Sequence, residues 1–127
     1  MRHRSLLLVL VGCTLATLSA SQPAPDAERT AAITVMRAIN TAENAVKQSG
    51  GKYVELASLL DHQAMGRVKA NLVINGTAVS HMGAQVRLTV SPDAAGYQVM
   101  VVPVATCGTA VFSDERGLIY TGKVLDC

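Results

Sequence analysis

The stretch AERTAAITVMRAINTAENAVKQ, residues 27–48, decides the fold. It contains neither proline nor glycine, and Asp26 before it suits the positive end of a helix dipole. Apolar side chains recur at spacings of three and four residues: Ala32, Val35, Met36, Ile39, Ala42 and Val46. This spacing places them on one face of an α-helix, which the rest of the chain must cover. Ser49-Gly50-Gly51 ends the helix, because glycine suits the position after a helix C-terminus.

Asn40 places a polar residue in the middle of this predicted helix. Asparagine is a poor helix former, because its side chain competes for backbone hydrogen bonds. Two interpretations stay open at this point. The side chain either faces solvent or hydrogen-bonds the neighbouring loop.

Alternating polar and apolar residues in the second half of the chain predict two antiparallel hairpins. The predicted strands are residues 85–90, 96–102, 109–112 and 118–121. The first two flank a turn that contains Pro92, and the last two flank a polar turn in which Gly117 suits a left-handed conformation.

Between the long helix and these hairpins the pattern is less regular. Residues 53–60 suit a short helical turn packed on the long helix. Residues 65–74 suit either a strand or a second short helix, before a turn at Asn75-Gly76. We therefore expect an α+β fold, in which one long amphipathic helix packs on an antiparallel sheet of about four strands.

The first residues have the order of a secretory signal peptide. A basic start, Met1–Arg4, precedes an apolar run, Leu6–Leu18, and the small residues Ser19-Ala20-Ser21. The run is shorter than the roughly 20 apolar residues that a spanning helix needs, so we expect no membrane span after cleavage. We predict a periplasmic or extracellular protein with a signal peptide at 1–21, a Pro-rich spacer at 22–26 and a single globular domain at 27–127.

Leu10-Val11-Gly12-Cys13 resembles a bacterial lipobox, which gives processing a second route. On this route Cys13 becomes the lipidated first residue and anchors the domain to a membrane. The apolar run continues past Cys13, which favours ordinary cleavage near Ser21. Both routes remain open.

Two cysteines, Cys107 and Cys127, remain after the leader. An even number of cysteines in an oxidising compartment favours a disulfide between them. A disulfide that closes the loop between Cys107 and Cys127 would stabilise the fold by about 3 kcal/mol. Two free thiols are the alternative.

Charge and aromatic content argue against nucleic acid as a partner. Without Arg2 and Arg4 of the leader, the chain has nine basic and nine acidic side chains, and the basic ones form no cluster in the sequence. Its aromatic side chains are few: Tyr53, Tyr97, Phe112 and Tyr120. Neither phosphate neutralisation nor base stacking has a platform here.

The sequence contains no motif that predicts an enzyme. The histidines beyond the leader are His62 and His81, each in a polar, loop-like context, and no Gly-x-Ser-x-Gly elbow is present. Asp61-His62 is a weak metal signal on its own, and Asp114-Glu115 is typical of a solvated turn. We expect no catalytic residue, metal or cofactor. An enzyme would need His62 or His81 to meet an acid in one cleft.

Three stretches occur in a characteristic order. They are residues 32–43, which include Arg37-Ala38-Ile39-Asn40-Thr41-Ala42, residues 49–59, which include Gly50-Gly51-Lys52-Tyr53, and residues 111–120, which include Asp114-Glu115-Arg116-Gly117. This order resembles the globular part of type IV pilin-like and pseudopilin-like proteins of bacteria. The resemblance implies a helix laid across an antiparallel sheet, a cysteine-bounded C-terminal region, and a role through surfaces rather than catalysis.

Residues 1–21 differ from a pilin leader, which is cut after Gly and precedes a long apolar filament helix. We therefore expect an exported, non-enzymatic pilin-like protein that acts as a structural or interaction component of the cell envelope, with protein partners there. A small periplasmic or lipid-anchored ligand-binding module is the alternative, and it would need an apolar cavity under the sheet. The loops at 73–83 and 94–96 are the expected contact surfaces.

Overall fold

A computed structural model describes residues 25–103 and 107–123 of the chain. The predicted signal peptide at 1–21, Cys13 and Cys127 lie outside these residues. Within the described ranges, no helix is both long enough and apolar enough to cross a bilayer.

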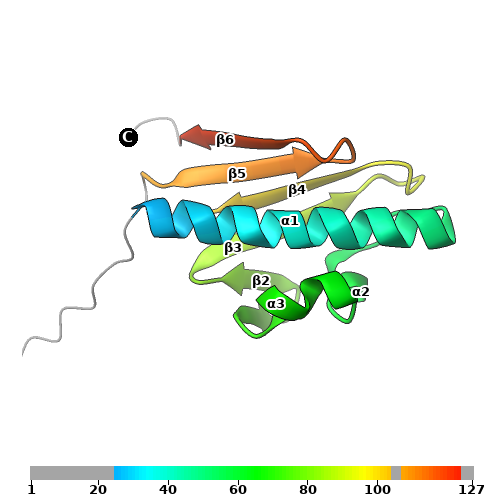
Figure 1. Ribbon diagram of the computed structural model, residues 1–127, viewed down its shortest axis with the longest axis horizontal. Coiled ribbons are helices and arrows are strands. Elements are labelled where there is room, and N and C mark those ends of the chain that lie inside the picture. Colours follow the sequence, from blue (N-terminus) through cyan, green and yellow to red (C-terminus); the bar gives the residue numbers. More distant parts are fainter. Residues whose placement is uncertain (1–24, 104–106, 124–127) are drawn as a thin grey trace, which may run out of the picture.

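One long helix lies across an antiparallel sheet (Figure 1). The helices are α1 (Pro25–Gly50), α2 (Leu56–Leu59), the 3₁₀ helix η1 (Gln63–Met65) and α3 (Gly66–Lys69). The strands are β1 (Leu72–Asn75), β2 (Ala78–His81), β3 (Ala84–Val90), β4 (Tyr97–Val102), β5 (Thr109–Asp114) and β6 (Ile119–Lys123), and they follow one another in the sheet in chain order. The α+β prediction and both hairpins are confirmed, but the sheet has six strands rather than about four.

The sequence pattern missed β2, and it predicted β1 only as one of two alternatives for residues 65–74. Two-residue turns join them to each other and to β3, at Gly76-Thr77 and Met82-Gly83. Gly76, Met82 and Gly83 have φ values of 62°, 49° and 84°. Such turns need positive φ, which glycine adopts readily and methionine does not. Because Met82 occupies the second turn, the sequence gives little indication of a turn there. Residues 65–74 contain both predicted alternatives in succession, a short helix and then β1.

Helix α1 covers the predicted stretch 27–48 and extends two residues beyond it at each end, so it starts inside the predicted spacer at 22–26. Pro25 is its first residue, and Asp26 and Glu28 lie in the first turn, at the positive end of the helix dipole. At the other end Gly51 has φ +74°, and its N–H donates to the carbonyl of Lys47 at 2.8 Å.

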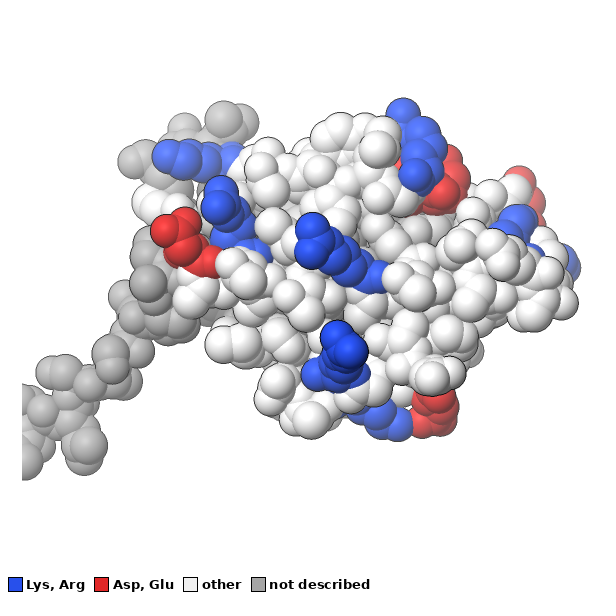
Figure 2. Space-filling view, in the orientation of Figure 1, with Lys and Arg blue, Asp and Glu red and all other residues white. Residues whose placement is uncertain are grey.

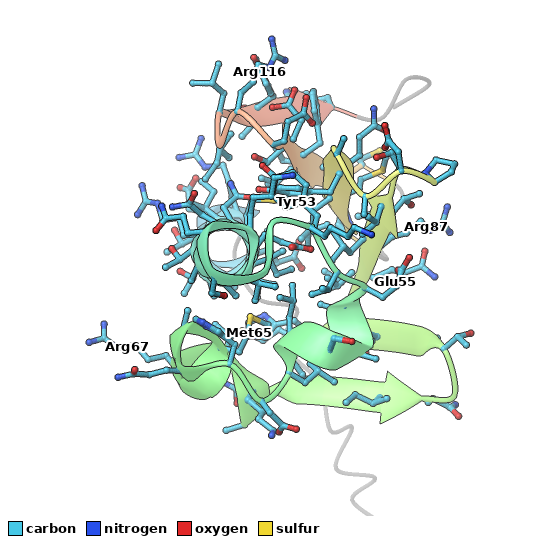
Figure 3. The ribbon with its side chains drawn as sticks, turned by 90° about the vertical axis from the view of Figure 1, so that its right-hand side faces the viewer. Tyr53, Glu55, Met65, Arg67, Arg87 and Arg116 are labelled. Carbon is cyan, nitrogen blue, oxygen red and sulfur yellow. The ribbon has the colours of Figure 1, made fainter. Side chains whose placement is uncertain are left out.

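The apolar face of α1 packs on the sheet, above all on β5 and β4. Val35, Met36 and Ile39 are completely buried there. The sheet contributes Val79, Val86, Leu88, Val99, Val101 and Val111, and the short helices contribute Leu56, Leu59, Met65 and Val68. The core is therefore mostly aliphatic, with Tyr97 of β4 as its buried aromatic residue, and in the described ranges every helix lies on the same side of the sheet (Figures 1 and 3).

Candidate functional site

The face of the sheet that points away from α1 is the candidate functional surface. Side chains alternate between the two faces of each strand, and in β4 the inward residues are buried while Gln98 and Met100 are exposed. Figure 3 shows the two sides: Arg67 projects on the helix side and Arg87 projects on the opposite side. No described element covers this second side, which we call the open face.

A row of four side chains crosses the middle of the open face. The strand register pairs Arg87 with Met100, Met100 with Phe112, and Phe112 with Tyr120, on β3, β4, β5 and β6. Met100, Phe112 and Tyr120 are 44%, 42% and 38% exposed. The two aromatic rings stack with their centroids 5.3 Å apart. Cross-strand aromatic pairs stabilise a sheet, but their remaining exposed area is apolar surface left in water.

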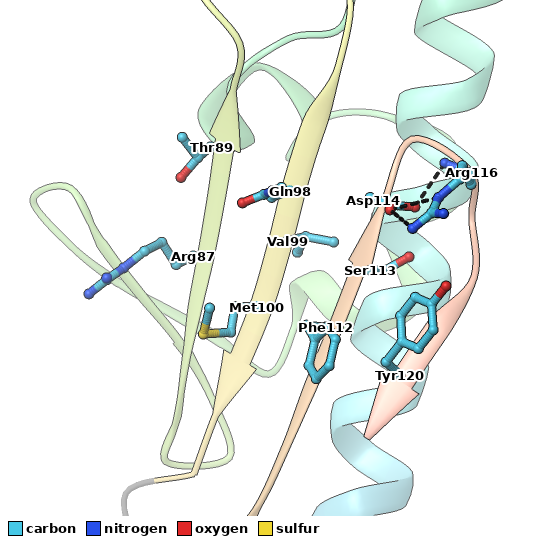
Figure 4. A pocket seen from close by; sticks show the side chains of 10 residues that line it. All are labelled: Arg87, Thr89, Gln98, Val99, Met100, Phe112, Ser113, Asp114, Arg116 and Tyr120. Carbon is cyan, nitrogen blue, oxygen red and sulfur yellow. Dashed lines mark hydrogen bonds and ion pairs between the residues drawn. The ribbon is translucent and has the colours of Figure 1, made fainter. Parts of the chain in front are cut away.

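Polar side chains border this row towards the β5–β6 turn (Figure 4). Asp114 accepts hydrogen bonds from the Arg116 guanidinium, which hold the pKa of Asp114 below its usual range. Together the row and its border line a hollow of about 540 Å³: Arg87, Thr89, Gln98, Val99, Met100, Phe112, Ser113, Asp114, Arg116 and Tyr120. A shallow apolar floor with a polar border is the usual composition of a protein-binding surface.

Arg87 is the charge on the open face that no carboxylate balances among the described residues. Its guanidinium has one described hydrogen bond, to the Gln85 side chain at 3.5 Å. The Asp114–Arg116 pair at the other side of the hollow is neutral as a unit. The open face therefore combines an apolar centre with one available cation.

Asn40 lies at the centre of a polar network on the helix side. Its amide donates to the Ser113 hydroxyl at 2.8 Å, and its carbonyl oxygen accepts from the Tyr97 hydroxyl at 2.8 Å. The hydrogen-bonding interpretation of Asn40 is thus correct, although its partners lie on β4 and β5 rather than on a loop. Burial raises the pKa of Tyr97, so its hydroxyl keeps its proton. The network fixes where α1 sits on the sheet.

Glu43 is a fully buried acid one turn further along α1. Its Oε2 accepts from the Val54 N–H at 3.2 Å, and its Oε1 has no partner among the described residues. Burial raises the pKa of Glu43, and the Val54 N–H opposes this only in part. Buried acids of this kind occur in active sites. Among the described residues, however, Glu43 does not belong to any group of three His, Cys, Asp or Glu side chains that could hold a metal ion.

The two histidines have separate structural settings. His62 caps η1, where its Nδ1 accepts from the Ala64 N–H at 3.1 Å. His81 is at the end of β2 and only 5% exposed, so the expectation of a loop-like context was wrong, and burial lowers its pKa. His81 lines a hollow with Asp26, whose side chain is 95% exposed and lies 3.9 Å from Arg29.

The remaining residues that the sequence analysis considered are Asp61, the two cysteines Cys107 and Cys127, and Cys13. Asp61 is paired with Lys69 on the surface, and no group of three His, Cys, Asp or Glu suited to a metal occurs in residues 25–103 and 107–123. Cys107 is exposed just before β5. Its predicted disulfide partner Cys127 lies outside the described residues, so the bond remains a prediction, as does lipidation at Cys13.

Sequence reasoning missed the open face as a site. The loops at 73–83 and 94–96 were the expected contact surfaces, but the first of them is largely the β1–β2 hairpin. The available signal was the alternation within β4 and β5, where Met100 and Phe112 occupy outward positions that polar residues usually fill. On the helix side, by contrast, charged side chains are scattered (Figure 2).

Comparison with models of known protein families, with curated proteins and with solved structures finds no match to this chain. The resemblance of residues 27–120 to pilin-like proteins therefore remains a prediction.

Proposed function

We propose that this chain is an exported, non-enzymatic, pilin-like protein of the cell envelope, and that it binds a protein partner through the open face of its sheet. The observation that supports the proposal is the exposed row of Met100, Phe112 and Tyr120 on a face that no described element covers. Aromatic side chains and methionine are enriched at interfaces, and clustered aromatic anchors contribute most of the binding energy.

The chemistry of the open face limits the kind of partner. Three neighbouring apolar side chains favour an apolar segment, and Arg87 at the end of the row favours an acidic residue beside that segment. The neutral Asp114–Arg116 pair offers hydrogen bonds but no net charge. The preferred partner is therefore a protein segment with apolar side chains and an aspartate or glutamate at one end of them.

Site-specific photo-crosslinking tests this proposal. The photo-reactive residue p-benzoylphenylalanine replaces Phe112 on the open face or, as a matched control, Thr34, which is exposed on α1. We expect a discrete crosslinked product from position 112, none of that size from position 34, and a several-fold loss of the product when Arg87→Glu is added. Equal products from both positions, or no product from position 112, would refute the assignment of the open face.

Export is tested separately, by mass spectrometry of the protein isolated from cells that express the whole sequence. We expect a new N-terminus near Ser21, or a lipidated Cys13. A protein that retains Met1 and stays in the cytoplasm would contradict the envelope location without affecting the binding surface.

A second candidate function, a small ligand-binding module, is favoured by a hollow between α2 and the β1–β3 end of the sheet. It has a volume of about 470 Å³, and Leu56, Leu60 and Ile74 are among its lining residues. This volume is within the range of small-molecule sites. Binding of an apolar dye such as anilinonaphthalene sulfonate to the native protein, abolished by Ile74→Glu but not by Phe112→Ser, would favour this function over the first.

A further inference from the structure

Strand β6 is one of the two edges of the sheet and pairs only with β5 among the described strands (Figure 1). An edge strand presents backbone N–H and C=O groups that have no ladder partner. Proteins usually protect such edges with charged residues, proline, a bulge or a very short strand. β6 has none of these in its centre: it contains no proline, its ladder with β5 runs through five unbroken pairs, and its one charge, Lys123, is its last residue.

Two copies of β6 can pair with each other in an antiparallel arrangement. A register centred on Thr121 pairs every residue of Ile119–Lys123 with a residue of a second β6, and other registers leave one or both ends unpaired. In this register Tyr120 lies opposite Gly122 of the other strand. The two Lys123 side chains fall at opposite ends of the ladder, so they do not repel one another closely.

Gly122 has no side chain, so it leaves room on the open face for the Tyr120 ring of a second copy. Within the chain the Phe112 ring already lies over Gly122, where an added Cβ would be 3.6 Å from Phe112 Cε1. A Tyr120 ring from the opposite strand would lie over the same glycine and meet Phe112 there. The stacked Phe112–Tyr120 pairs of two copies would then form one continuous cluster of four rings.

The helix layer leaves space for this arrangement. The two β5 strands would be three strand spacings apart, about 14 Å at the usual spacing of about 4.8 Å. Helix α1 lies on β5 and β4, and a helix with its side chains is about 10–12 Å wide, so two copies of α1 fit side by side.

We propose that β6 pairs with β6 of a second copy of this chain, antiparallel and centred on Thr121, so that two six-stranded sheets become one continuous sheet. The contact is closed by a two-fold axis, which uses both β6 edges and leaves no unfilled site for further growth at them. This dimer is independent of the partner bound by the open face, although it joins the two open faces into one surface.

A charge-swap experiment tests the dimer. Sedimentation equilibrium of the unmodified protein should give a reversible monomer–dimer equilibrium. Thr121→Lys and Thr121→Glu each place like charges opposite one another on the axis, and each alone should raise the dimer dissociation constant at least about tenfold. An equimolar mixture of the two variants should restore the dimer, because opposite charges then face each other.

Val73→Lys is the matched control, since Val73 is an exposed residue of β1, the other edge strand. It should leave the dimer unchanged, and circular dichroism should show that all variants fold. A protein that stays monomeric, a dimer lost in Val73→Lys, or a mixture that stays monomeric would each overturn the proposal. Sedimentation does not depend on crosslinking at position 112, and a product from position 112 with the mass of two copies of this chain reports the dimer, whereas a product of any other mass reports a separate partner, so the two proposals fail separately.

Discussion

Glu43 should make this protein less stable than it could be at neutral pH. Its side chain is fully buried, Oε2 has one hydrogen bond at 3.2 Å, and Oε1 has no partner among the described residues. Leaving a buried polar group unsatisfied costs about 1–3 kcal/mol, and an ionised group costs more. Glu43→Gln keeps the shape and the acceptor for Val54, and it cannot ionise; its amide nitrogen takes the place of Oε1 and has no described acceptor either, so the variant removes only the additional cost of the charge. We expect it to raise the free energy of unfolding by about 1–3 kcal/mol at pH 8.

The sign of the pH dependence follows from the raised pKa of Glu43. The folded state binds a proton at this carboxyl more tightly than the unfolded state, whose pKa is near 4.5. The protonated group therefore supports folding fully below pH 4.5, and this support is lost as the pH rises through the folded pKa. Glu43→Gln should not lose stability in this way. Its free energy of unfolding should therefore exceed that of the unmodified protein only slightly at pH 4 and by the full amount at pH 8.

Urea denaturation of both proteins between pH 4 and pH 8, followed by circular dichroism, measures this advantage. The difference between the proteins at each pH removes the opposite contribution of His81, whose lowered pKa favours folding above pH 6.5. Glu115→Gln, at an exposed position in the β5–β6 turn, is the control and should change little at any pH. A Glu43→Gln protein that is less stable at pH 8 would refute the reasoning, since the carboxylate would then make a favourable contact.

Three further predictions concern stability and are measured by thermal and urea unfolding. Met82→Asn should stabilise the protein by about 0.5–1 kcal/mol, because asparagine tolerates the φ of 49° in the β2–β3 turn better than methionine; no gain would mean that Met82 contributes packing. Tyr97→Phe should cost about 1 kcal/mol, since Asn40 loses its donor, and an unchanged midpoint would show that water replaces it. Met100→Ser should stay within about 0.5 kcal/mol, whereas Val99→Ser, one residue away on the buried face, should cost several times more; equal costs would contradict the assignment of the two faces.

Much of the fold could be predicted from the sequence because its signals are local. The period of the apolar residues from Ala32 to Val46 defines one face of α1, and Gly51 ends the helix through its positive φ. The later hairpins have strands of five to seven residues, long enough for alternation to be visible. β1 and β2 have four residues each, too few for alternation to be visible. Asn75-Gly76 marks the turn between them, but Met82 leaves the turn before β3 without a sequence signal.

The open face could not be predicted in the same way, because it depends on register. Met100, Phe112 and Tyr120 are separated by 12 and 8 positions in the sequence, and only the pairings of β4 with β5 and β5 with β6 bring them together. A shift of one residue in either pairing would turn one of these side chains towards α1. Two features on opposite faces hold the register: the buried Ser113 under Asn40, and the open Gly122 under the Phe112 ring. The residues that position α1 on one face therefore also decide which apolar side chains remain exposed on the other.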